Sequence, residues 1–480
     1  MSSKASSSPS VPSNMTRRPS EEDEQRLRRL AESDHRHLWH PFTPMDEWER
    51  EDPPLIIERG EGAYLIDVEG KRYLDGVSSL WVNIHGHRRA EIDEAIRHQL
   101  DRIAHSTMLG MGQDSAIELA EKLAAITPPG LSRVFYSDSG STAVEVALKI
   151  AFQYQKQKTP ARPEKSKFIA LNRAYHGDTV GSVSVGGIEL FHDIFRPLLF
   201  ETLRAEAPYC YRCPRGAVDS PCPVCTGDDI EQLITEHADE VAAVIVEPMI
   251  QGAAGIIPQP KGFLRRVREA CTRSGVLLIA DEVATGFGRT GRMFASEHEN
   301  VAPDILCLAK GITGGYLPLA ATLTTEEIFD AFRGAPAEGR TFFHGHSYTG
   351  NPLACAAALA NLSIFENEKT LDTLAPKIIR LWKELELLRQ IPAVGDVRGL
   401  GFMAGIELVA DRETKSPYPP EARMGRQVIL AARRRGLAIR PLGDVLVLMP
   451  PYCVSEDEIA WMAGVVGESI QEVTKKPESP

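Results

Sequence analysis

Residues 276–291 read VLLIADEVATGFGRTG, an apolar run that stops at an acid and continues into a glycine-rich turn. A short apolar run bounded in this way predicts a buried strand that ends near Asp281. The next run, DILCLAK at 304–310, predicts a second strand that ends at Lys310. Similar runs are VFYS at 134–137, FIALN at 168–172, AAVIVEP at 242–248 and LAATLTT at 319–325. Because amphipathic stretches separate these runs, we predict an α/β fold with a large, mostly parallel sheet covered by helices.

Two of the intervening stretches carry helical signals. Ser115 and Glu118 have the spacing of a capping box, and we expect the helix after them to bury Ile117. A second apolar stripe with helical spacing begins at Phe263 and should end at Gly275, because glycine accepts the left-handed backbone that closes a helix.

The chain is expected to divide into several parts. The N-terminal residues are rich in Ser, Pro and charge, and the segment after them has a hairpin turn at Glu69-Gly70 that should pack with the C-terminal part. The predicted parts are a disordered tail (1–24), an N-terminal segment (25–75), a large α/β domain (76–350) with a cysteine-rich insertion (205–230), and a smaller α+β domain (351–480).

Composition narrows the classes of function. The chain has 480 residues and a net charge of −12, so its bulk charge does not favour a nucleic-acid partner. No apolar run approaches the roughly 18 residues that a membrane span needs, and the first residues lack the apolar core of a signal peptide. Eight cysteines in so long a chain do not indicate a disulfide scaffold. We therefore expect a cytoplasmic protein that acts on small molecules, with no nucleic-acid or membrane partner.

A phosphate site is indicated where the strand at 134–137 runs directly into a helix. The connecting residues are SDSGST at 137–142. Gly140 lets the backbone approach a ligand, and the hydroxyl of Ser141 and the free N–H groups of the helix end favour an anion. An ordinary polar helix cap would have the same sequence.

Asp281 and Lys310 each end a predicted strand, at the sheet edge where α/β proteins bind ligands. A carboxylate in that position needs a cationic partner, for which either a protonated pyridine nitrogen or Arg289 would serve. A lysine at the end of a buried strand is poorly placed to reach water and is often a Schiff-base residue. A phosphate site, an acid and a lysine together are what pyridoxal phosphate requires.

The sequence resembles the class III (ω-amino acid type) aminotransferases, which are fold-type I pyridoxal-phosphate enzymes. ADEVATGFGRTG at 280–291, with Lys310 after it, is specific to that class. Other segments are similar to the branch that aminates 7-keto-8-aminopelargonate in biotin biosynthesis. They are HLWHPFTPM (37–45), DGVSSLWVNIHGH (75–87), YSDSGSTAVEVALK (136–149), AYHGDT (174–179), FHGHSYTGNPLACAAA (343–358) and RPLGD (440–444).

The resemblance implies a role for each residue around the cofactor. Lys310 would hold pyridoxal phosphate covalently and move the substrate proton, Asp281 would keep the pyridine nitrogen protonated, and Tyr175 would stack on the ring. Gly140 and Ser141 would bind the phosphate, and the second subunit of a homodimer would add two residues to that site: His346 and Ser347.

For the substrate, the resemblance places Arg440 on the carboxylate of the keto acid, where a guanidinium makes two parallel hydrogen bonds. Trp81, Gly345 and Phe42 would line the channel, together with Tyr175 and Lys310. Glu247 would support the site from behind without a catalytic step.

Two positions depart from relatives that use S-adenosylmethionine as amino donor. Those relatives commonly have Tyr where this chain has Phe42, and two adjacent tryptophans where it has Leu80-Trp81. A hydroxyl and an aromatic face that could hold a sulfonium are therefore missing. The expected donor is S-adenosylmethionine, and L-lysine is the alternative.

The insertion contains Cys210-x-x-Cys213 and Cys222-x-x-Cys225, a spacing that is able to wrap a tetrahedral zinc ion. Transamination requires no metal, so the predicted catalytic site includes none, and a structural zinc remains open.

Two alternative functions are considered. The first is another class III activity, such as a 4-aminobutyrate or ω-amino acid aminotransferase with the same cofactor residues. The second is a non-catalytic, pyridoxal-phosphate-binding sensor.

Overall fold

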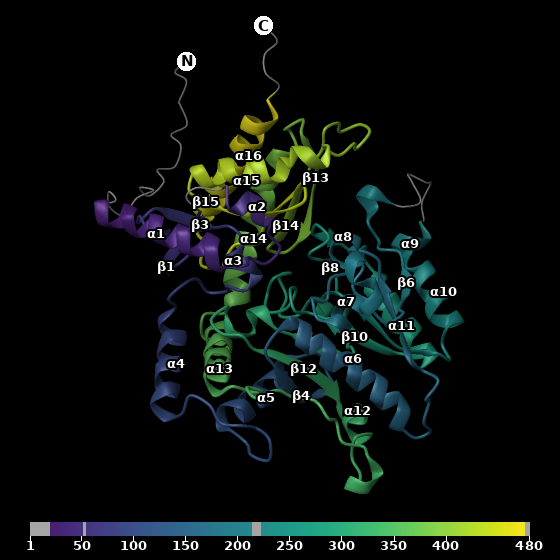
Figure 1. Ribbon diagram of the computed structural model, residues 1–480. Coiled ribbons are helices and arrows are strands. Elements are labelled where there is room, and N and C mark those ends of the chain that lie inside the picture. The colour runs from purple at the N-terminus through teal and green to yellow at the C-terminus, as the bar shows by residue number, and fades with distance from the viewer. Residues whose placement is uncertain (1–19, 51–53, 214–221, 476–480) are drawn as a thin grey trace.

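A seven-stranded sheet forms the centre of the computed structural model, which describes residues 20–50, 54–213 and 222–475 (Figure 1). Its strands, in spatial order, are β4 (Leu131–Ser137), β12 (Ala320–Thr325), β11 (Ile305–Leu308), β10 (Leu277–Asp281), β7 (Val241–Val246), β5 (Lys167–Leu171) and β6 (Leu203–Ala205). Only β12 runs antiparallel to its neighbours. The expected α/β fold with a mostly parallel sheet is confirmed.

Helices cover both faces of this sheet because its strands are apolar on both sides. Ile279 of β10 packs with α6 (Gly140–Gln157) on one face. Its neighbour Leu278 points to the opposite face and packs with α10 (Asp228–Glu236) and α11 (Phe263–Ser274). Successive side chains in a strand alternate between faces, so an unbroken apolar run requires cover on both.

The helix after residue 113 differs from the expectation. α5 spans Asp114–Ile126 and its N-cap is Gln113, without a side-chain cap, so the capping box at Ser115 is wrong. Ser115 instead lies buried in the first turn, and Ile117 is 60% exposed. The buried face instead carries Ala116, Leu119 and Leu123, and Ile117 lies outside it because successive residues of an α-helix are about 100° apart. α11 ends at Gly275 with φ 58°, as expected.

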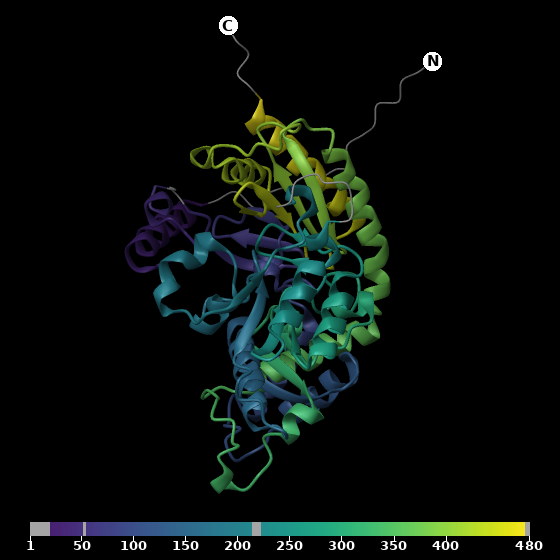
Figure 2. The same ribbon diagram turned by 90° about the vertical axis from the view of Figure 1, so that its right-hand side faces the viewer.

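The C-terminal part has an antiparallel sheet of its own. Its strands, in order, are β13 (Val394–Leu400), β14 (Met403–Leu408), β17 (Val445–Leu448) and β16 (Arg440–Leu442). The long helix α14 (Thr370–Leu388) contacts α16 (Glu456–Thr474), which in turn contacts α15 (Met424–Arg434). Figure 2 shows this part, in yellow-green and yellow, above the large sheet and its helices.

The N-terminal hairpin lies against this C-terminal part (Figure 1). β1 (Ile57–Glu61), β2 (Tyr64–Asp67) and β3 (Arg72–Asp75) form a sheet whose fourth strand is β15 (Leu437–Ala438). Gly70 turns the β2–β3 hairpin with φ 85°, which glycine adopts without strain. β3 thus pairs in parallel with β15 of the C-terminal part, and the predicted domain boundaries stay a prediction.

Helix α1 (Glu21–His37) begins inside the segment expected to be a disordered tail. A capping box explains the start: Ser20 Oγ accepts from the Asp23 N–H and the Asp23 carboxylate accepts from the Ser20 N–H. Residues 1–19 of that tail lie outside the described residues.

The remaining elements are shorter or lie around the sheet. The helices are α2 (Met45–Trp48), α3 (Ser78–Trp81), α4 (Ala90–Arg102), α7 (Val180–Val185), α8 (Glu189–His192), α9 (Pro223–Thr226), α12 (Glu326–Asp330) and α13 (Pro352–Asn367), and the strands are β8 (Ile250–Gln251) and β9 (Ile257–Pro258). α13 packs against α4 and α5. Among the described residues, we find no helix with the length and apolar character of a membrane span.

Candidate active site

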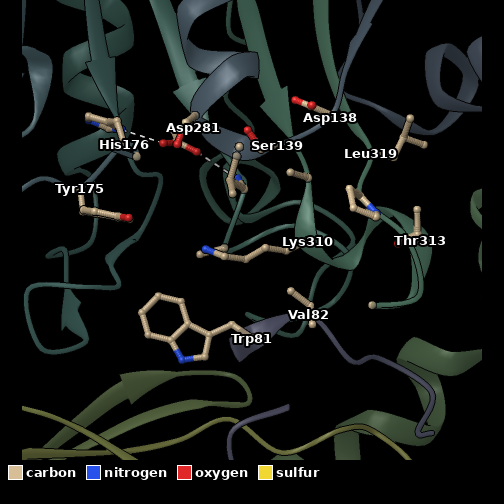
Figure 3. A pocket seen from close by; sticks show the side chains of 18 of the residues that line it. Trp81, Val82, Asp138, Ser139, Tyr175, His176, Asp281, Lys310, Thr313 and Leu319 are labelled. Carbon is tan, nitrogen blue, oxygen red and sulfur yellow. Dashed lines mark hydrogen bonds and ion pairs between the residues drawn. The ribbon is translucent and has the colours of Figure 1, made fainter. Parts of the chain in front are cut away.

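A pocket of about 390 Å³ opens at the carboxyl ends of the parallel strands (Figure 3). Loops that follow β4, β5, β7, β10 and β11 all contribute to its wall. Because β12 is antiparallel, its first residues reach the same edge, and Leu319 lines the pocket. The size lies in the range typical of small-molecule sites.

One end of the pocket is the N-terminus of α6. Ser139 caps the helix by accepting from the Thr142 N–H. The N–H groups of Gly140 and Ser141 have no hydrogen-bond acceptor among the described residues, and both residues line the pocket. A Cβ on Gly140 would lie 2.6 Å from a methyl carbon of Val283. Any residue other than glycine would therefore clash with Val283 at this position. This end is built to receive an anion.

Asp281 ends β10 and is only 4% exposed. Its carboxylate lies 2.7 Å from Nδ1 of His176 and accepts from the Val283 N–H at 3.0 Å. Arg289, which the sequence offered as a partner, instead donates to the carbonyl oxygens of Pro450 and Asn83. That alternative is wrong, and Asp281 faces the pocket with room for another cationic partner.

Lys310 follows β11 and points into the middle of the pocket (Figure 3). Its backbone has φ 46°, a conformation that costs a lysine free energy and that is found at functional sites. Burial lowers the pKa of its amine, against the opposing charges of Asp281 and Glu247. Nζ lies 4.9 Å from the centre of the Trp81 ring. An amine whose pKa is lowered in this way is suited to act as a nucleophile or base.

Tyr175 and Glu247 form a second wall. The Tyr175 hydroxyl donates to Asp178 at 2.6 Å, and burial together with this bond raises the pKa of the phenol. Glu247 follows β7 and accepts from the N–H groups of Tyr175 and Gly252. Burial raises the pKa of Glu247 to about 7. Glu247 therefore holds two pocket loops together from behind, as expected.

Trp81 closes the pocket opposite Asp281 (Figure 3). It ends a strained turn in which Ser78, Ser79 and Trp81 all have positive φ. Asp75 fixes this turn by accepting from the Ser79 N–H at 2.8 Å and from its hydroxyl at 3.0 Å. Trp81 is only 7% exposed. It therefore packs in the core and also lines the pocket.

The other expected site residues, although they belong to the described chain, do not line this pocket. They are Phe42, Gly345, His346, Ser347 and Arg440. Gly345, Ser347 and Arg440 are exposed. Phe42 is 53% exposed and packs edge-on against Phe191, which packs in the same way against Tyr175.

Pyridoxal phosphate fits the residues that are present. The open N–H groups of α6 would hold its phosphate, Asp281 its ring nitrogen, and Lys310 its aldehyde carbon. The glycine at 140 and the amine with lowered pKa both point to this cofactor. When bound, the cofactor withdraws electrons from the substrate carbon that loses a proton.

Comparison with known proteins identifies the family. The family Aminotransferase class-III matches residues 46–470, which is most of the chain. The chain belongs to the class III aminotransferases. Members of this class depend on pyridoxal phosphate, so the resemblance, the enzyme class and the cofactor expected from the motifs are confirmed. The non-catalytic sensor is therefore set aside.

Several relatives of this aminotransferase carry one name. The adenosylmethionine-8-amino-7-oxononanoate aminotransferase of Nitratidesulfovibrio vulgaris is 58% identical over 450 residues, which are 94% of this chain and 83% of that protein. Its namesake from Geobacter sulfurreducens is 54% identical over 447 residues, 93% of this chain and 98% of that protein.

Solved structures agree with the fold of this class III aminotransferase. The crystal structure of the Methanocaldococcus jannaschii enzyme of the same name has a TM-score of 0.88 and 49% identity, and covers 93% of this chain and 99% of its own. A thermostable (S)-enantioselective omega-transaminase from Thermomicrobium roseum has a TM-score of 0.87 and 36% identity over the same shares of both chains.

Two site residues escaped the reasoning from sequence. His176 binds Asp281 from behind, and its Nε2 is buried without a partner among the described residues. Its position next to Tyr175 in AYHGDT was the available signal. Phe191, which links Phe42 to Tyr175, has no such signal, because an aromatic residue in a short helix is usually part of a core.

Proposed function

We propose that this chain is the cytoplasmic enzyme that transfers the amino group of S-adenosylmethionine to 8-amino-7-oxononanoate (7-keto-8-aminopelargonate). The product would be 7,8-diaminopelargonate, an intermediate of biotin biosynthesis. The observation that carries the proposal is the placement of Lys310 between Asp281 and Trp81 in one pocket. The names of the relatives supply the substrates. The cysteines of the described chain are free thiols, which suits a reducing compartment.

Each residue has one task in this proposal. Lys310, with its lowered pKa, would take the proton from the substrate carbon that bears the amino group and pass it to the bound cofactor. Asp281, held by His176, would face the ring nitrogen of the cofactor and keep that nitrogen protonated. Trp81 closes the pocket and excludes water. Arg440 binds the substrate carboxylate.

We also propose that the working enzyme is a homodimer. The segment at 343–348 exposes two large aromatic side chains, Phe343 (82%) and Tyr348 (64%), which is unfavourable on a free surface. Between them lies His346, whose Nε2 is buried without a partner among the described residues. A second subunit would cover the aromatic side chains, and this segment would in turn complete the partner's phosphate site.

The half-reaction tests the donor. The purified enzyme is mixed with S-adenosylmethionine and, separately, with L-lysine, and the visible absorption of the cofactor is followed. With S-adenosylmethionine only, we expect absorption at about 420 nm, from the aldehyde form of the cofactor, to fall. Absorption at about 330 nm, from its amine form, should rise. A response to lysine alone would instead identify lysine as the donor. The missing hydroxyl at Phe42 and the missing aromatic face at Leu80 favour this alternative.

The full reaction tests the acceptor. We expect 7,8-diaminopelargonate to form when 8-amino-7-oxononanoate is added with the donor. If neither donor yields this product and 4-aminobutyrate is turned over well, the chain is a different class III aminotransferase.

A further inference from the structure

Four cysteine sulfurs converge outside the active site. Cys210 begins a short 3-10 turn (Cys210–Arg212) and Cys213 follows it, whereas Cys222 caps α9 and Cys225 lies within it. The Sγ atoms of Cys210 and Cys225 are 3.4 Å apart, and those of Cys213 and Cys222 are also 3.4 Å apart. The sulfurs of Cys213, Cys222 and Cys225 all lie within 4.8 Å of one another.

These distances suit a shared metal ion. All four residues are free thiols. Ligands at the usual Zn–S distance of about 2.3 Å in a tetrahedron lie roughly 3.8 Å from one another, close to the spacing of this cluster. A pair of thiols alone would not require three sulfurs to lie within 4.8 Å of one another with the sulfur of Cys210 only 3.4 Å from one of them.

We propose that Cys210, Cys213, Cys222 and Cys225 bind one structural Zn²⁺ ion. All four positions are filled by sulfur, so the ion has no open site for substrate or water and is not catalytic. None of the four cysteines lines the active-site pocket, as far as the described residues extend. The proposal is therefore independent of the transamination that we assign to the chain.

The first pair of cysteines is anchored to the C-terminal sheet. The Tyr209 hydroxyl donates to the buried carboxylate of Glu407 in β14, and Arg212 Nε donates to the same carboxylate at 2.5 Å. Arg212 also donates to the carbonyl of Lys415, whose ammonium donates back to the carbonyl of Tyr211 at 2.8 Å.

The second pair is anchored to the helices of the large sheet. Gly227 ends α9 with φ 84° and leads directly into α10, which packs on α11 (Figure 1). Arg266 of α11 forms ion pairs with Asp228 and Glu231 of α10. A zinc ion would thus connect β14 of the C-terminal sheet to the helix layer of the large sheet. Since metal binding is coupled to folding, the ion would stabilise this junction.

Metal content is the first measurement. The full-length enzyme, loaded with pyridoxal phosphate and purified without a polyhistidine tag from zinc-supplemented cells, is analysed by inductively coupled plasma mass spectrometry. We expect about one zinc per chain. Cys222→Ser and Cys225→Ser should lose most of it, and the matched control Cys453→Ser, an exposed cysteine elsewhere, should keep it.

Thiol chemistry on the unaltered enzyme keeps the test valid if a cysteine variant fails to fold. A mercurial should release zinc, detected with a chromogenic chelator, in step with modification of the four thiols. After release, hydrogen exchange should rise at residues 208–213 and 222–227 while the cofactor absorption stays unchanged.

Three results would overturn the proposal. The first is a zinc-free enzyme whose intact mass shows two disulfides among the four cysteines. The second is a zinc-free enzyme with four reactive thiols after growth in zinc. The third is zinc that is present equally in Cys225→Ser and Cys453→Ser, because the metal would then lie elsewhere.

Discussion

The cofactor residues and the substrate residues of this enzyme differ sharply in how one chain holds them. Gly140, Ser141, Tyr175, Asp281 and Lys310 line a single pocket and follow four strands of one sheet. The other five proposed substrate and partner residues lie outside this pocket, and most are exposed. They are Phe42, Gly345, His346, Ser347 and Arg440.

This difference indicates which half of the site depends on assembly. The carboxyl ends of parallel strands meet at one edge whatever the rest of the molecule does, so the cofactor half forms within one chain. The substrate half is carried by loops and by a short edge strand, whose positions a second subunit would complete. Substitutions in the cofactor half should therefore stop catalysis. Substitutions in the substrate half should weaken substrate binding, or have an effect that depends on the second subunit.

The largest effect is expected from Lys310→Ala. Turnover should fall by about 10⁴-fold or more, because the variant lacks the only amine in the described pocket wall. Pyridoxal phosphate should still bind, but borohydride should no longer fix it to the chain, as measured by intact mass. Lys383→Ala, an exposed lysine, is the control. Near-normal turnover in Lys310→Ala would remove the residue from the mechanism.

Asp281→Asn should lower kcat by about 10³-fold, since an amide does not hold its ring partner in the charged form. The expected readout is slow single-turnover kinetics with an unchanged unfolding temperature. An unchanged kcat would mean that another group supplies the negative charge.

Glu247 gives a pH-dependent effect on stability. Its pKa is raised from 4.5 to about 7 by burial, so the folded chain favours the protonated carboxyl. Stability from this group is fully present below pH 4.5 and is lost as the pH rises to about 7, because the unfolded chain ionises first. Relative to Glu247→Gln, the native protein should lose about 3 kcal/mol over this range in denaturant titrations. A pH-independent difference would contradict the raised pKa.

Arg440→Ala tests the substrate half. The KM for the keto acid should rise by roughly 10- to 100-fold, because one charge-assisted contact is lost, while the half-reaction with the donor changes less. Arg28→Ala, in α1 and 75% exposed, should leave both unchanged. Equal losses in both half-reactions would place Arg440 in the cofactor half instead.

The smallest expected change comes from mixing subunits. Lys310→Ala and the double variant His346→Ala/Ser347→Ala should each be weak alone. Because a symmetric dimer would then contain one intact site in each mixed pair, unfolding and refolding them together should restore about a quarter of the native activity. If no activity returns, His346 and Ser347 act within their own chain or not at all.

Much of the cofactor half could be predicted from sequence because its signals are local. An apolar run that ends in Asp281 or Lys310 predicts both a buried strand and a polar residue at the end of that strand. Ser115 shows where local signals fail. Its spacing to Glu118 predicts a capping box, but the helix begins after Gln113 and buries Leu119 and Leu123. Tertiary packing, which the local spacing does not report, decides where this helix begins. His176 could not be assigned, because its role depends on Asp281 more than a hundred residues away.

The sequence by itself determined the fold class and the cofactor, and it predicted the strand ends and the glycine that are proposed to hold this cofactor, since these are properties of short segments. Only the tertiary structure decided that Arg289 faces away from Asp281, that the hairpin at 57–75 pairs with β15, and that Cys213, Cys222 and Cys225 converge with Cys210 beside them. Such contacts join residues far apart in the chain, and only the packing of the elements determines which side chains meet.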